Sequence, residues 1–270
     1  MNRLITDMLA QADPSQVAGL SRFFKTGPGQ YGEGDKFLGI KVPVTREVVK
    51  NAWRELDFTD LDECLRSEFH EIRLAGLLAL IQIFSHARKG SVSFSSARKG
   101  PVSLSLARKV ASSDSLSARL SSGLPLQQQC VDFYLAHTAT INNWDLVDLS
   151  CYPLLGEWLL DKDRNLLYEL ARNGKTIWEQ RIGMVSTMTF VRHGQLADTF
   201  AIADILLHHP HDLIQKAVGW LLREAGKRDE SALLAFLEPR AATMPRTALR
   251  YALEKLDEPL RKEFLGKRVQ

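Results

Sequence analysis

Apolar residues recur at helical spacing along nearly the whole chain, and this periodicity limits what the chain can fold into. Val17, Leu20 and Phe24 form one such series, and another runs from Ile72 to Ile81. Apolar residues three or four positions apart share one face of a helix. The sustained alternation of apolar and polar residues that marks strands is absent from the body of the sequence. The sequence therefore predicts an all-α fold.

Successive amphipathic segments each carry a basic residue, and their spacing indicates a repeat. Arg73 lies in HEIRLAGLLAL, Arg181 in TIWEQRIGMV, Lys216 in HDLIQKAVGWLLR and Arg246 in MPRTALRYAL, the last three being 35 and 30 residues apart. That period is typical of helical hairpins stacked into a solenoid. We therefore expect an α-solenoid of HEAT-like repeats whose inner helices present these cations along one concave face. A non-repeating helical bundle is the alternative.

Proline and glycine mark the predicted boundaries of these helices. Proline near the first helical position favours a helix start. Four such starts are predicted, at Pro14, Pro43, Pro210 and Pro245. Residues 27–39, GPGQYGEGDKFLG, are too rich in glycine to be helical and are expected to form a loop.

Residues 86–124 interrupt the helical pattern and define the predicted domain organisation. Ala-Arg-Lys recurs there at 87–89, 97–99 and 107–109, embedded in serine. Seven Lys and Arg side chains against one acid give this stretch a net charge of +6, so the rest of the chain carries −3 of the total of +3. We expect a single domain over 1–270 with a low-complexity basic insertion at 86–124. The insertion is interpreted either as an arm on a phosphate backbone or as a solvated insertion, and the second is favoured.

The cysteines and the apolar runs indicate the compartment. Cys64, Cys130 and Cys151 are odd in number and widely spaced, which fits neither a disulfide framework nor a metal-binding knuckle. The start of the sequence contains no unbroken apolar core, and no later run approaches the roughly 18 apolar residues that span a bilayer. We expect buried thiols, a cytoplasmic protein and no membrane segment.

The segment INNWDLVDLS, residues 141–150, holds the clearest candidate site. Asn142 or Asn143 is a suitable N-cap for a helix that contains Trp144 and Asp148. Because these two residues are four positions apart, their side chains share one helical face. An indole face and a carboxylate together can bind a cationic or π-rich ligand. The alternative is a buried tryptophan beside a solvated aspartate, with no function.

Arg181 and Trp220 lie on the predicted helices of following repeats, so stacking of the repeats could bring both close to that face. An arginine there could bind a phosphate through its planar guanidinium group. The alternative is a ladder of Asp–Arg pairs that joins adjacent repeats. The sequence alone does not separate the two interpretations.

Other constellations carry weaker signals. A cluster of histidines around Pro210 is better explained by a helix boundary than by a metal site: His208, His209 and His211. No GxSxG, HExxH or P-loop pattern occurs, and the glycines of 27–34 do not follow a strand. The aromatic residues around these glycines are expected to anchor the core or the loop: Phe23, Phe24 and Tyr31.

Five segments of the chain are similar to one known family. They are FFKTGPGQYGEGDKFLGIKVP at 23–43, HEIRLAGLLAL at 70–80, NNWDLVD at 142–148, IWEQRIGMVSTM at 177–188 and LIQKAVGWLLRE at 213–224. They occur in the order found in that family and cover most of the chain outside the insertion. The chain thus resembles the bacterial DNA alkylation repair family of the AlkD type.

This resemblance implies a fold, a partner and a reaction. It implies an α-solenoid that grips duplex DNA in a concave, positively charged groove and acts as a monomer. It implies removal of cationic N3- and N7-alkylated purines by cleavage of the N-glycosidic bond, with no metal or organic cofactor and with the lesion left stacked. The alkylated purine leaves as a neutral base, so no general acid is required.

The resemblance also implies roles for particular residues. Trp144 and Trp220 would pack against the deoxyribose and backbone at the lesion. Asp148 would stabilise the developing oxocarbenium ion and position the attacking water. The residues expected to contact the DNA backbone are Arg181, Lys216 and Arg223, joined on the concave face by Arg73.

Two departures from the family pattern leave other functions open. The insertion at 86–124 is not part of that pattern, and the loop FFKTGPGQYGEGD is longer than in the best-known members. Relatives in this superfamily bind branched or damaged DNA without excision, so a non-catalytic DNA-structure-binding protein is the first alternative. A HEAT-repeat scaffold for a basic protein partner is the second, suggested by the net charge of −3 outside the insertion.

Overall fold

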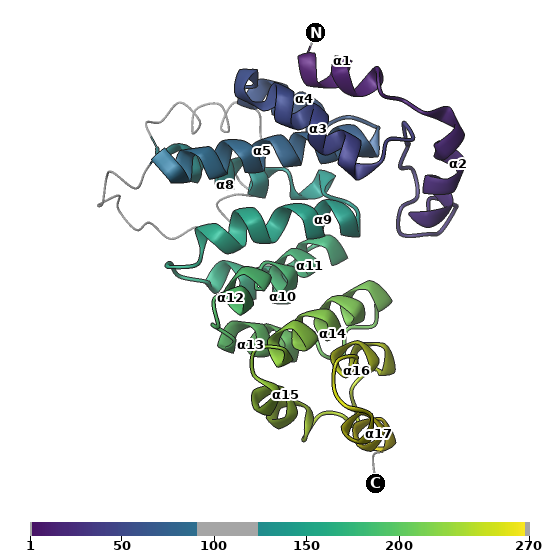
Figure 1. Cartoon of the computed structure of the whole chain (residues 1–270), viewed down its shortest axis with the longest axis vertical. Coiled ribbons are helices and arrows are strands. Elements are labelled where there is room, and N and C mark those ends of the chain that lie inside the picture. Colours follow the sequence, from purple (N-terminus) through teal and green to yellow (C-terminus); the bar gives the residue numbers. More distant parts are fainter. Residues whose placement is uncertain (1, 91–123, 268–270) are drawn as a thin grey trace. The chain divides into compact units, whose positions relative to one another are not determined.

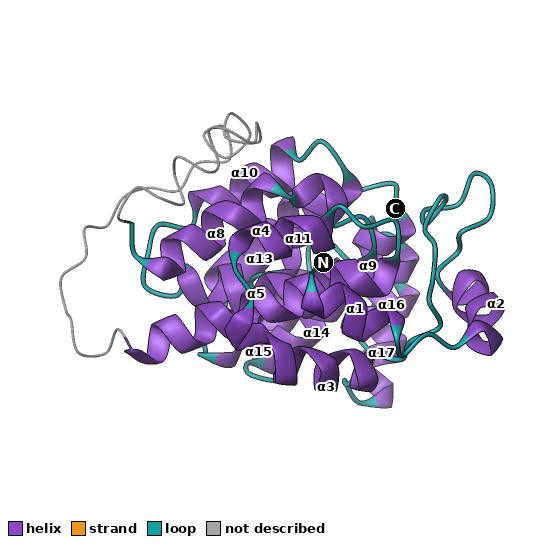
Figure 2. Ribbon diagram, turned by 90° about the horizontal axis from the view of Figure 1, so that it is seen from above, coloured by secondary structure: helices purple, strands orange, loops and turns teal. Residues whose placement is uncertain are grey.

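The computed structural model describes residues 2–90 and 124–267, and all regular elements in these ranges are helices (Figure 1; Figure 2). The one extended pairing in the same ranges is an isolated bridge between Lys36 and Phe69. The predicted all-α fold class is therefore confirmed. The chain divides into two compact helical units, Met1–Ser150 and Cys151–Gln270.

The first unit is organised around one long helix, α5. The helices of this part of the chain are α1 (Arg3–Leu9), α2 (Pro14–Phe23), α3 (Val42–Ala52), α4 (Phe58–Leu65), α5 (His70–Gly90), α8 (Leu126–Ala136) and α9 (Trp144–Cys151). Helices α1, α3, α4 and α8 all pack against α5. The predicted apolar series on α5 is buried from Ile72 to Leu78. Burial of this face supplies the hydrophobic core of the unit.

Helix α2 differs from its neighbours because none of its residues is buried. Its apolar residues Val17 and Leu20 are half-buried, and Phe23 at its end is 60% exposed. Figure 1 and Figure 2 both show α2 at the margin of its unit, joined to α3 by the long glycine-rich loop. The carboxylate of the N-cap residue Asp13 accepts a hydrogen bond from Ser15 N–H, which satisfies one of the free donors at the start of the helix.

The predicted insertion begins inside a helix. Helix α5 continues to Gly90, so residues 86–90 are helical, whereas the sequence predicted that the low-complexity stretch starts at 86. Alanine, arginine and lysine are good helix formers, which explains the continuation. Residues 91–123, which hold most of the predicted insertion, lie outside the described residues.

The second unit is a stack of helical hairpins. Its helices are α10 (Asn165–Asn173), α11 (Ile177–Val185), α12 (Met188–Arg192), α13 (Ala197–Ile205), α14 (Asp212–Gly226), α15 (Glu230–Leu237), α16 (Arg246–Ala252) and α17 (Glu258–Gly266). Helix α11 packs against α14, and α14 packs against α16. These three helices carry Arg181, Lys216 and Arg246, the residues that marked the predicted repeat. Within this unit the expected solenoid order of the hairpins is confirmed.

Of the four prolines predicted to begin helices, two lie in the first turn of a helix and two lie before it. Pro14 and Pro43 lie in the first turn of α2 and α3, as expected. Pro210 and Pro245 lie earlier, since α14 begins at Asp212 after the N-cap His211, and Pro245 is itself the N-cap of α16. The shift at α14 has a local cause, because the His211 side chain accepts a hydrogen bond from Leu213 N–H at 3.2 Å and thereby caps the helix.

The glycine-rich segment is an ordered loop, and Glu71 of α5 anchors its end. The buried Glu71 carboxylate accepts hydrogen bonds from three consecutive backbone N–H groups, those of Leu38, Gly39 and Ile40, at 3.0, 2.9 and 3.1 Å. Gly39 adopts a φ of +87°. Because three donors converge on one carboxylate, the segment before α3 is fixed to the start of α5.

Replacing Gly39 by alanine is expected to destabilise the protein by more than the same change at Gly34. Both glycines have a φ near +90°, but a Cβ at Gly39 lies 1.9 Å from the Asp13 carbonyl oxygen, whereas one at Gly34 meets nothing within 4 Å. The left-handed conformation alone costs about 1 kcal/mol, and the backbone clash brings the Gly39→Ala cost to about 3 kcal/mol. Urea unfolding of both variants measures the difference. Equal losses of stability contradict the close approach of Gly39 to Asp13.

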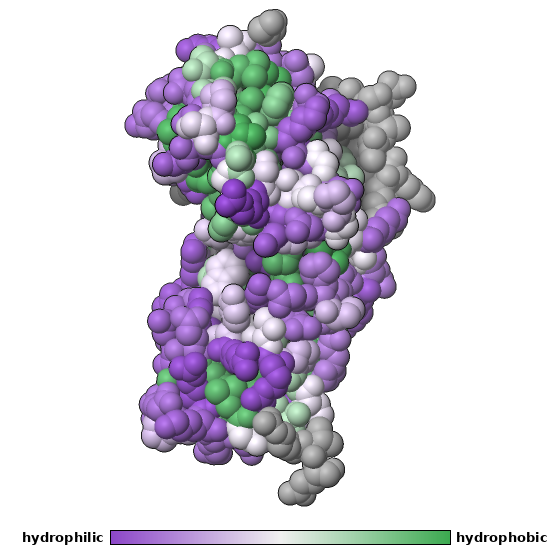
Figure 3. Space-filling model, turned by 90° about the vertical axis from the view of Figure 1, so that its right-hand side faces the viewer, coloured by the Kyte–Doolittle hydropathy of each residue, from purple (hydrophilic) through white to green (hydrophobic). Residues whose placement is uncertain are grey.

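The molecular surface mixes hydrophilic residues with small apolar patches. Figure 3 shows one face, on which hydrophobic side chains reach the surface in separate patches among hydrophilic ones. Among the helices that the structure describes, none has both the length and the hydropathy needed to cross a membrane.

Candidate active site

Trp144 and Asp148, the predicted central pair, lie one turn apart on α9. Asn143 comes directly before this helix, and its side-chain oxygen accepts a hydrogen bond from Trp144 N–H at 2.8 Å. Of the two asparagines predicted to cap the helix, Asn143 therefore binds its first free donor. Asn142 points elsewhere, toward the carboxylate of Asp35.

A cavity of about 410 Å³ lies against this face of α9, within the first unit. Its walls come from α2, the loop end at 37–41, the first turn of α3, α5 and α9, and both Trp144 and Asp148 line it. The remaining lining is mainly apolar, with three further aromatic residues: Phe23, Phe24 and Phe37. Concave apolar sites of roughly 300–1,000 Å³ with a few convergent polar groups are the usual form of ligand pockets. The predicted pair thus shares one cavity that can hold a ligand.

Two phenylalanine rings and one tyrosine hydroxyl contact the indole of Trp144 and hold it in place. The Phe24 ring stacks on it, with the ring centroids 5.4 Å apart, and the Phe23 ring approaches edge-on at 5.8 Å. The indole N–H donates a hydrogen bond to the Tyr31 hydroxyl at 3.3 Å. Phe24 is buried, as expected of a core anchor, but Phe23 is 60% exposed and lines the cavity. Of the two expected roles, an anchor of the core or of the loop, the exposure of Phe23 excludes the first.

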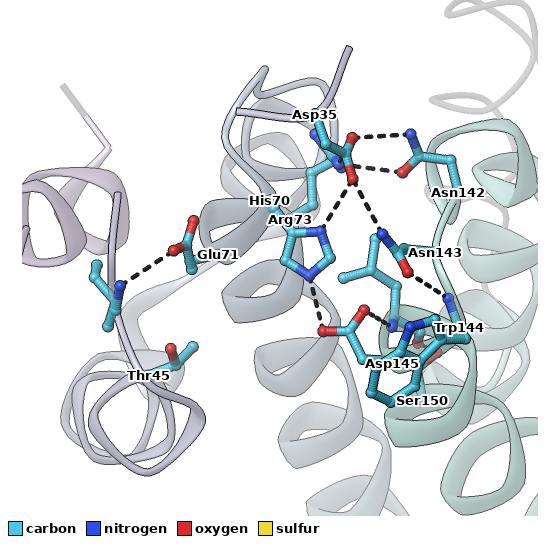
Figure 4. A network of polar contacts seen from close by, with 12 residues as sticks. Asp35, Thr45, His70, Glu71, Arg73, Asn142, Asn143, Trp144, Asp145 and Ser150 are labelled. Carbon is cyan, nitrogen blue, oxygen red and sulfur yellow. Dashed lines mark hydrogen bonds and ion pairs between the residues drawn. The ribbon is translucent and has the colours of Figure 1, made fainter. Parts of the chain in front are cut away.

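A buried polar network lines one side of the cavity through His70 and Asp145, and it joins three segments that are distant in the sequence (Figure 4). The His70 imidazole is at its centre, with Nε2 2.8 Å from Asp145 Oδ2 and Nδ1 3.2 Å from Asp35 Oδ2. Asp35 belongs to the glycine-rich loop, His70 to α5 and Asp145 to α9. All three side chains are at most 6% exposed. The first turn of α9 is therefore connected to the loop through one histidine.

Arg73 completes this network instead of facing solvent. Its guanidinium group donates to Asp35 Oδ1 at 2.6 Å and to Asn142 Oδ1 at 3.1 Å. The Arg73 side chain is 6% exposed. A buried guanidinium group paired with a carboxylate is not presented to a phosphate, because separating the pair would leave Asp35 with less compensation for its buried charge. The expected contact between Arg73 and the DNA backbone is corrected to an internal ion pair.

The ionisation of His70 follows from its two carboxylate neighbours. Burial by itself lowers the pKa of His70, but the hydrogen bonds with Asp145 and Asp35 outweigh this effect and raise the pKa to about 9. Burial likewise raises the pKa of Asp35, yet its hydrogen bond with His70 and the charge of Arg73 hold that pKa below its ordinary value. At neutral pH the imidazolium ion and Arg73 therefore balance the two carboxylates.

The pH range of this stabilisation follows from the direction of the shift. The folded-state pKa of His70, about 9, lies above the ordinary value of 6.5. The stability that His70 contributes is therefore fully present below pH 6.5 and is lost as the pH rises through about 9.

The sequence analysis did not identify Asp35, His70 or Asp145 as site residues. The available signal was the presence of polar residues inside otherwise apolar segments. His70 opens the segment HEIRLAGLLAL, and Asp145 stands beside Trp144 in NNWDLVD. Pairing them requires the tertiary fold, because the two hydrogen bonds of His70 span 35 and 75 residues.

In the second unit, one face of α14 carries three of the predicted site residues. Lys216, Trp220 and Arg223 follow at helical spacing, and Lys227 continues the series directly after the helix. Trp220 and Lys227 line a cavity of about 420 Å³ together with Arg192, Glu224 and Arg228. The opposite face of α14 is buried against the unit, including Ile214, Val218 and Leu222.

Three of these cations already have acidic partners, and one of the three is Lys227, which pairs with Glu224 at 2.7 Å. Lys216 pairs with Asp212 one turn earlier at 2.6 Å, and Arg223 pairs with Glu254 and Glu224. Arg181 of α11 is buried and donates a hydrogen bond to the Leu213 carbonyl oxygen at the start of α14. Arg181 and Trp220 belong to the second unit, whereas Trp144 and Asp148 belong to the first. Their convergence on one site stays a prediction.

The histidines around Pro210 lie at a helix boundary, as predicted. His211 is the N-cap of α14, and the ring nitrogen Nε2 of His209 lies 3.0 Å from Gln180 Oε1. In the described part of the chain no group of His, Cys, Asp or Glu side chains is arranged to hold a metal ion.

The three cysteines are free and buried, as predicted. Burial raises the pKa of the Cys64 and Cys130 thiols to about 12. Thiols that stay protonated at neutral pH are poor nucleophiles. Cys64 and Cys130 are therefore structural residues of the first unit.

Comparisons with known proteins agree with this architecture. A family model described as "DNA alkylation repair enzyme" matches residues 4–256. A solved structure described as a "Predicted DNA alkylation repair enzyme from Enterococcus faecalis" is similar to this chain, with a TM-score of 0.58 and 15% sequence identity over 92% of this chain and 98% of that chain. At that identity the structural likeness supports the fold alone. No curated protein matches this chain in sequence.

Proposed function

Because the chain belongs to the DNA alkylation repair enzyme family, we propose that it is a DNA glycosylase that removes N3- and N7-alkylated purines from duplex DNA. One observation carries this proposal. Trp144 and Asp148 reach the same cavity from one face of α9, so an aromatic face and a carboxylate are available to a single ligand. A cationic purine nucleotide is a ligand that such a pair attracts.

The main requirement of this reaction is one carboxylate that stabilises positive charge on the sugar. The bond between C1′ and the purine nitrogen breaks with both electrons passing to the base, which is cationic beforehand and leaves neutral. Positive charge develops on the sugar, and the Asp148 carboxylate stabilises it. Water then adds to C1′ and gives its proton to the carboxylate or to solvent. This is glycoside hydrolysis without the general acid.

The apolar cavity strengthens the effect of that carboxylate. Coulomb attraction between the Asp148 charge and the charge developing on the sugar is larger where water is excluded. The indole of Trp144 is held in place by Phe24 and Tyr31, so its face needs no reordering when the sugar arrives. A preorganised site of this kind lowers the barrier to bond cleavage.

We assign the DNA backbone contacts to the solvent-facing side of α14, since Arg181 is buried and held by the Leu213 carbonyl oxygen. Lys216 and Arg223 would bind phosphates on either side of Trp220, which would pack against the deoxyribose. The ion pair between Lys216 and Asp212 lies at the surface, where such pairs contribute little stability. Exchange of Asp212 for a phosphate as the partner of Lys216 therefore costs little.

Removing these cations is expected to reduce the salt dependence of DNA binding. Each phosphate contact contributes about 0.9 to the slope of log K against log salt concentration. We expect the Lys216→Ala and Arg223→Ala variants each to lower the slope by that amount, measured by fluorescence anisotropy with undamaged duplex. The control is Lys262→Ala on α17, a change of an exposed lysine that pairs with Glu258. A slope unchanged in both α14 variants contradicts the assignment.

The test of the proposed function is release of methylated purine from duplex DNA that carries N7-methylguanine or N3-methyladenine. Release of either base above the rate without protein supports the glycosylase. Salt-sensitive binding of the duplex without release favours the non-catalytic DNA-structure-binding alternative. Absence of both release and binding rejects the nucleic-acid functions and leaves the protein-interaction scaffold.

A further inference from the structure

The network around His70 is a buried group of charges in the first unit that the chemistry at Asp148 does not use. It joins the glycine-rich loop, α5 and the start of α9 by hydrogen bonds between side chains that are buried (Figure 4). Burying two carboxylates, an imidazole and a guanidinium group is costly unless every charge is compensated. A core of apolar side chains would stabilise the unit without that cost.

The network acts directly on the helix that carries the proposed catalytic residues. Asp145 follows Trp144 and lies less than one turn before Asp148. The Asp145 carboxylate forms a hydrogen bond with His70. The Asn143 side chain accepts a separate hydrogen bond from Trp144 N–H. Asn143 in turn donates to the Asp35 carboxylate at 3.4 Å. The first turn of α9 is therefore tied to Asp35 by two routes, one through His70 and one through Asn143.

We propose that His70 is a positioning residue for the reaction at Asp148. It links Asp145 to Asp35 and so fixes Trp144 and Asp148 relative to the cavity wall that the loop and α2 supply. The inference rests on the proposed function, since it assigns to His70 a part in the same site. His70 also lines the cavity, but the role proposed here acts through its hydrogen bond with Asp145.

The charge of His70 is part of the mechanism of positioning. Each ring nitrogen faces a carboxylate oxygen, and only the imidazolium ion can donate to both at once. The pKa of His70 is lowered by burial but raised to about 9 by the two carboxylates, so the ion persists at neutral pH. The other groups around it are Arg73 and Glu71 on α5, the stacked ring of Phe37 and the tilted ring of Phe24. Arg73 and Glu71 are each engaged with the loop.

A second buried histidine in the same unit provides the matched control. His137 follows α8, is buried like His70, and has Nε2 2.8 Å from Asp62 Oδ1 and Nδ1 2.8 Å from the Phe133 carbonyl oxygen. None of these partners lies on α9 or lines the cavity. Loss of His137 therefore perturbs the core of the unit without acting on Trp144 or Asp148.

The first experiment compares wild type, His70→Gln and His137→Gln in single-turnover release of N7-methylguanine at neutral pH. We expect His70→Gln to slow the chemical step about 100-fold, the usual scale for misplacement by about 1 Å. Its affinity for undamaged duplex is expected to stay at the wild-type value. His137→Gln is expected to keep the wild-type rate. Its thermal midpoint is expected to fall by about as much as that of His70→Gln. Equal losses of rate in both variants overturn the proposal.

The second experiment reports position without reference to activity. The chain contains five tryptophans, so 5-fluorotryptophan labelling gives a small set of fluorine resonances, and the Trp144→Phe variant assigns that of Trp144. We expect this resonance to shift in His70→Gln and in the milder Asp145→Asn, but not in His137→Gln. In wild type it is expected to titrate with the His70 pKa of about 9, and in His70→Gln this titration is absent.

The outcomes separate this inference from the proposed function. If wild type releases no methylated purine, the proposed function fails, and the Trp144 resonance still decides whether His70 positions α9. If His70→Gln does not fold, Asp145→Asn and the wild-type titration supply the same answer. A Trp144 resonance that is insensitive to both variants and to pH between 7 and 10 overturns the inference, whatever the activity.

Discussion

The Asp148→Asn variant is expected to release alkylated purines about 10³-fold more slowly than wild type, a loss on the scale of removing one preorganised electrostatic contact from a transition state. Asparagine keeps the shape of the side chain and removes its negative charge. The charge matters most when the glycosidic bond is nearly broken, because the sugar is then cationic. Binding of the intact duplex is expected to change little.

The measurement is single-turnover release from duplex that carries N7-methylguanine, with enzyme in excess so that product release does not limit the rate. Asp62→Asn is a suitable control, since Asp62 lies on α4, pairs with Arg66 and His137, and does not line the cavity. This control is expected to retain the wild-type rate. If Asp148→Asn releases base as fast as Asp62→Asn, the carboxylate of Asp148 is not the group that stabilises the transition state.

The helices themselves could be predicted from the sequence because their apolar faces are local patterns. The series from Ile72 to Ile81 identified α5, and glycine content identified the loop at 27–39. Helix ends were less certain, because a cap depends on one side chain. At α14 the His211 side chain caps the helix, which begins at Asp212, two residues after the proline that was expected to begin it.

The site residues that share one helix could likewise be predicted from the sequence, whereas contacts between distant segments could not. The shared face of Trp144 and Asp148 follows from their spacing of four, and the cavity lies against that face. Arg73 was expected on a concave surface because a cation on an amphipathic helix is usually exposed. Its carboxylate partner Asp35 lies 38 residues away, so only the folded chain shows that the guanidinium group is buried.

The convergence of Trp220 and Arg181 with Trp144 and Asp148 is a prediction of a different kind. It depends on how the two units are arranged, whereas the cavity and the His70 network are contained in the first unit. The chemistry at Asp148 therefore has its own local tests, and the role of α14 is tested separately by the salt dependence of DNA binding. If both units contribute to one DNA site, the variants at Asp148 and the variants on α14 must both impair excision of the lesion.

The largest loss of stability is expected from Glu71→Ala, which leaves the three buried N–H groups of Leu38, Gly39 and Ile40 without their acceptor. An unsatisfied buried donor costs about 1–3 kcal/mol, and the loop can relax to hydrate part of the set, so the expected loss is about 4 kcal/mol. The loop end that Glu71 holds forms one wall of the cavity. Its release should also slow excision, because Phe37 and Ile40 belong to that wall.

Glu68→Ala tests whether this loss comes from the hydrogen bonds rather than from the removal of any acid near the loop. Glu68 pairs with Lys36 at 2.7 Å, but both side chains are more than half exposed. An exposed pair contributes at most about 1 kcal/mol. Urea unfolding followed by the fluorescence of the tryptophans compares the two variants. A Glu71→Ala midpoint no lower than that of Glu68→Ala would mean that water replaces the carboxylate at the three donors, and the loop would then be held by its apolar contacts with α2 and α5 instead.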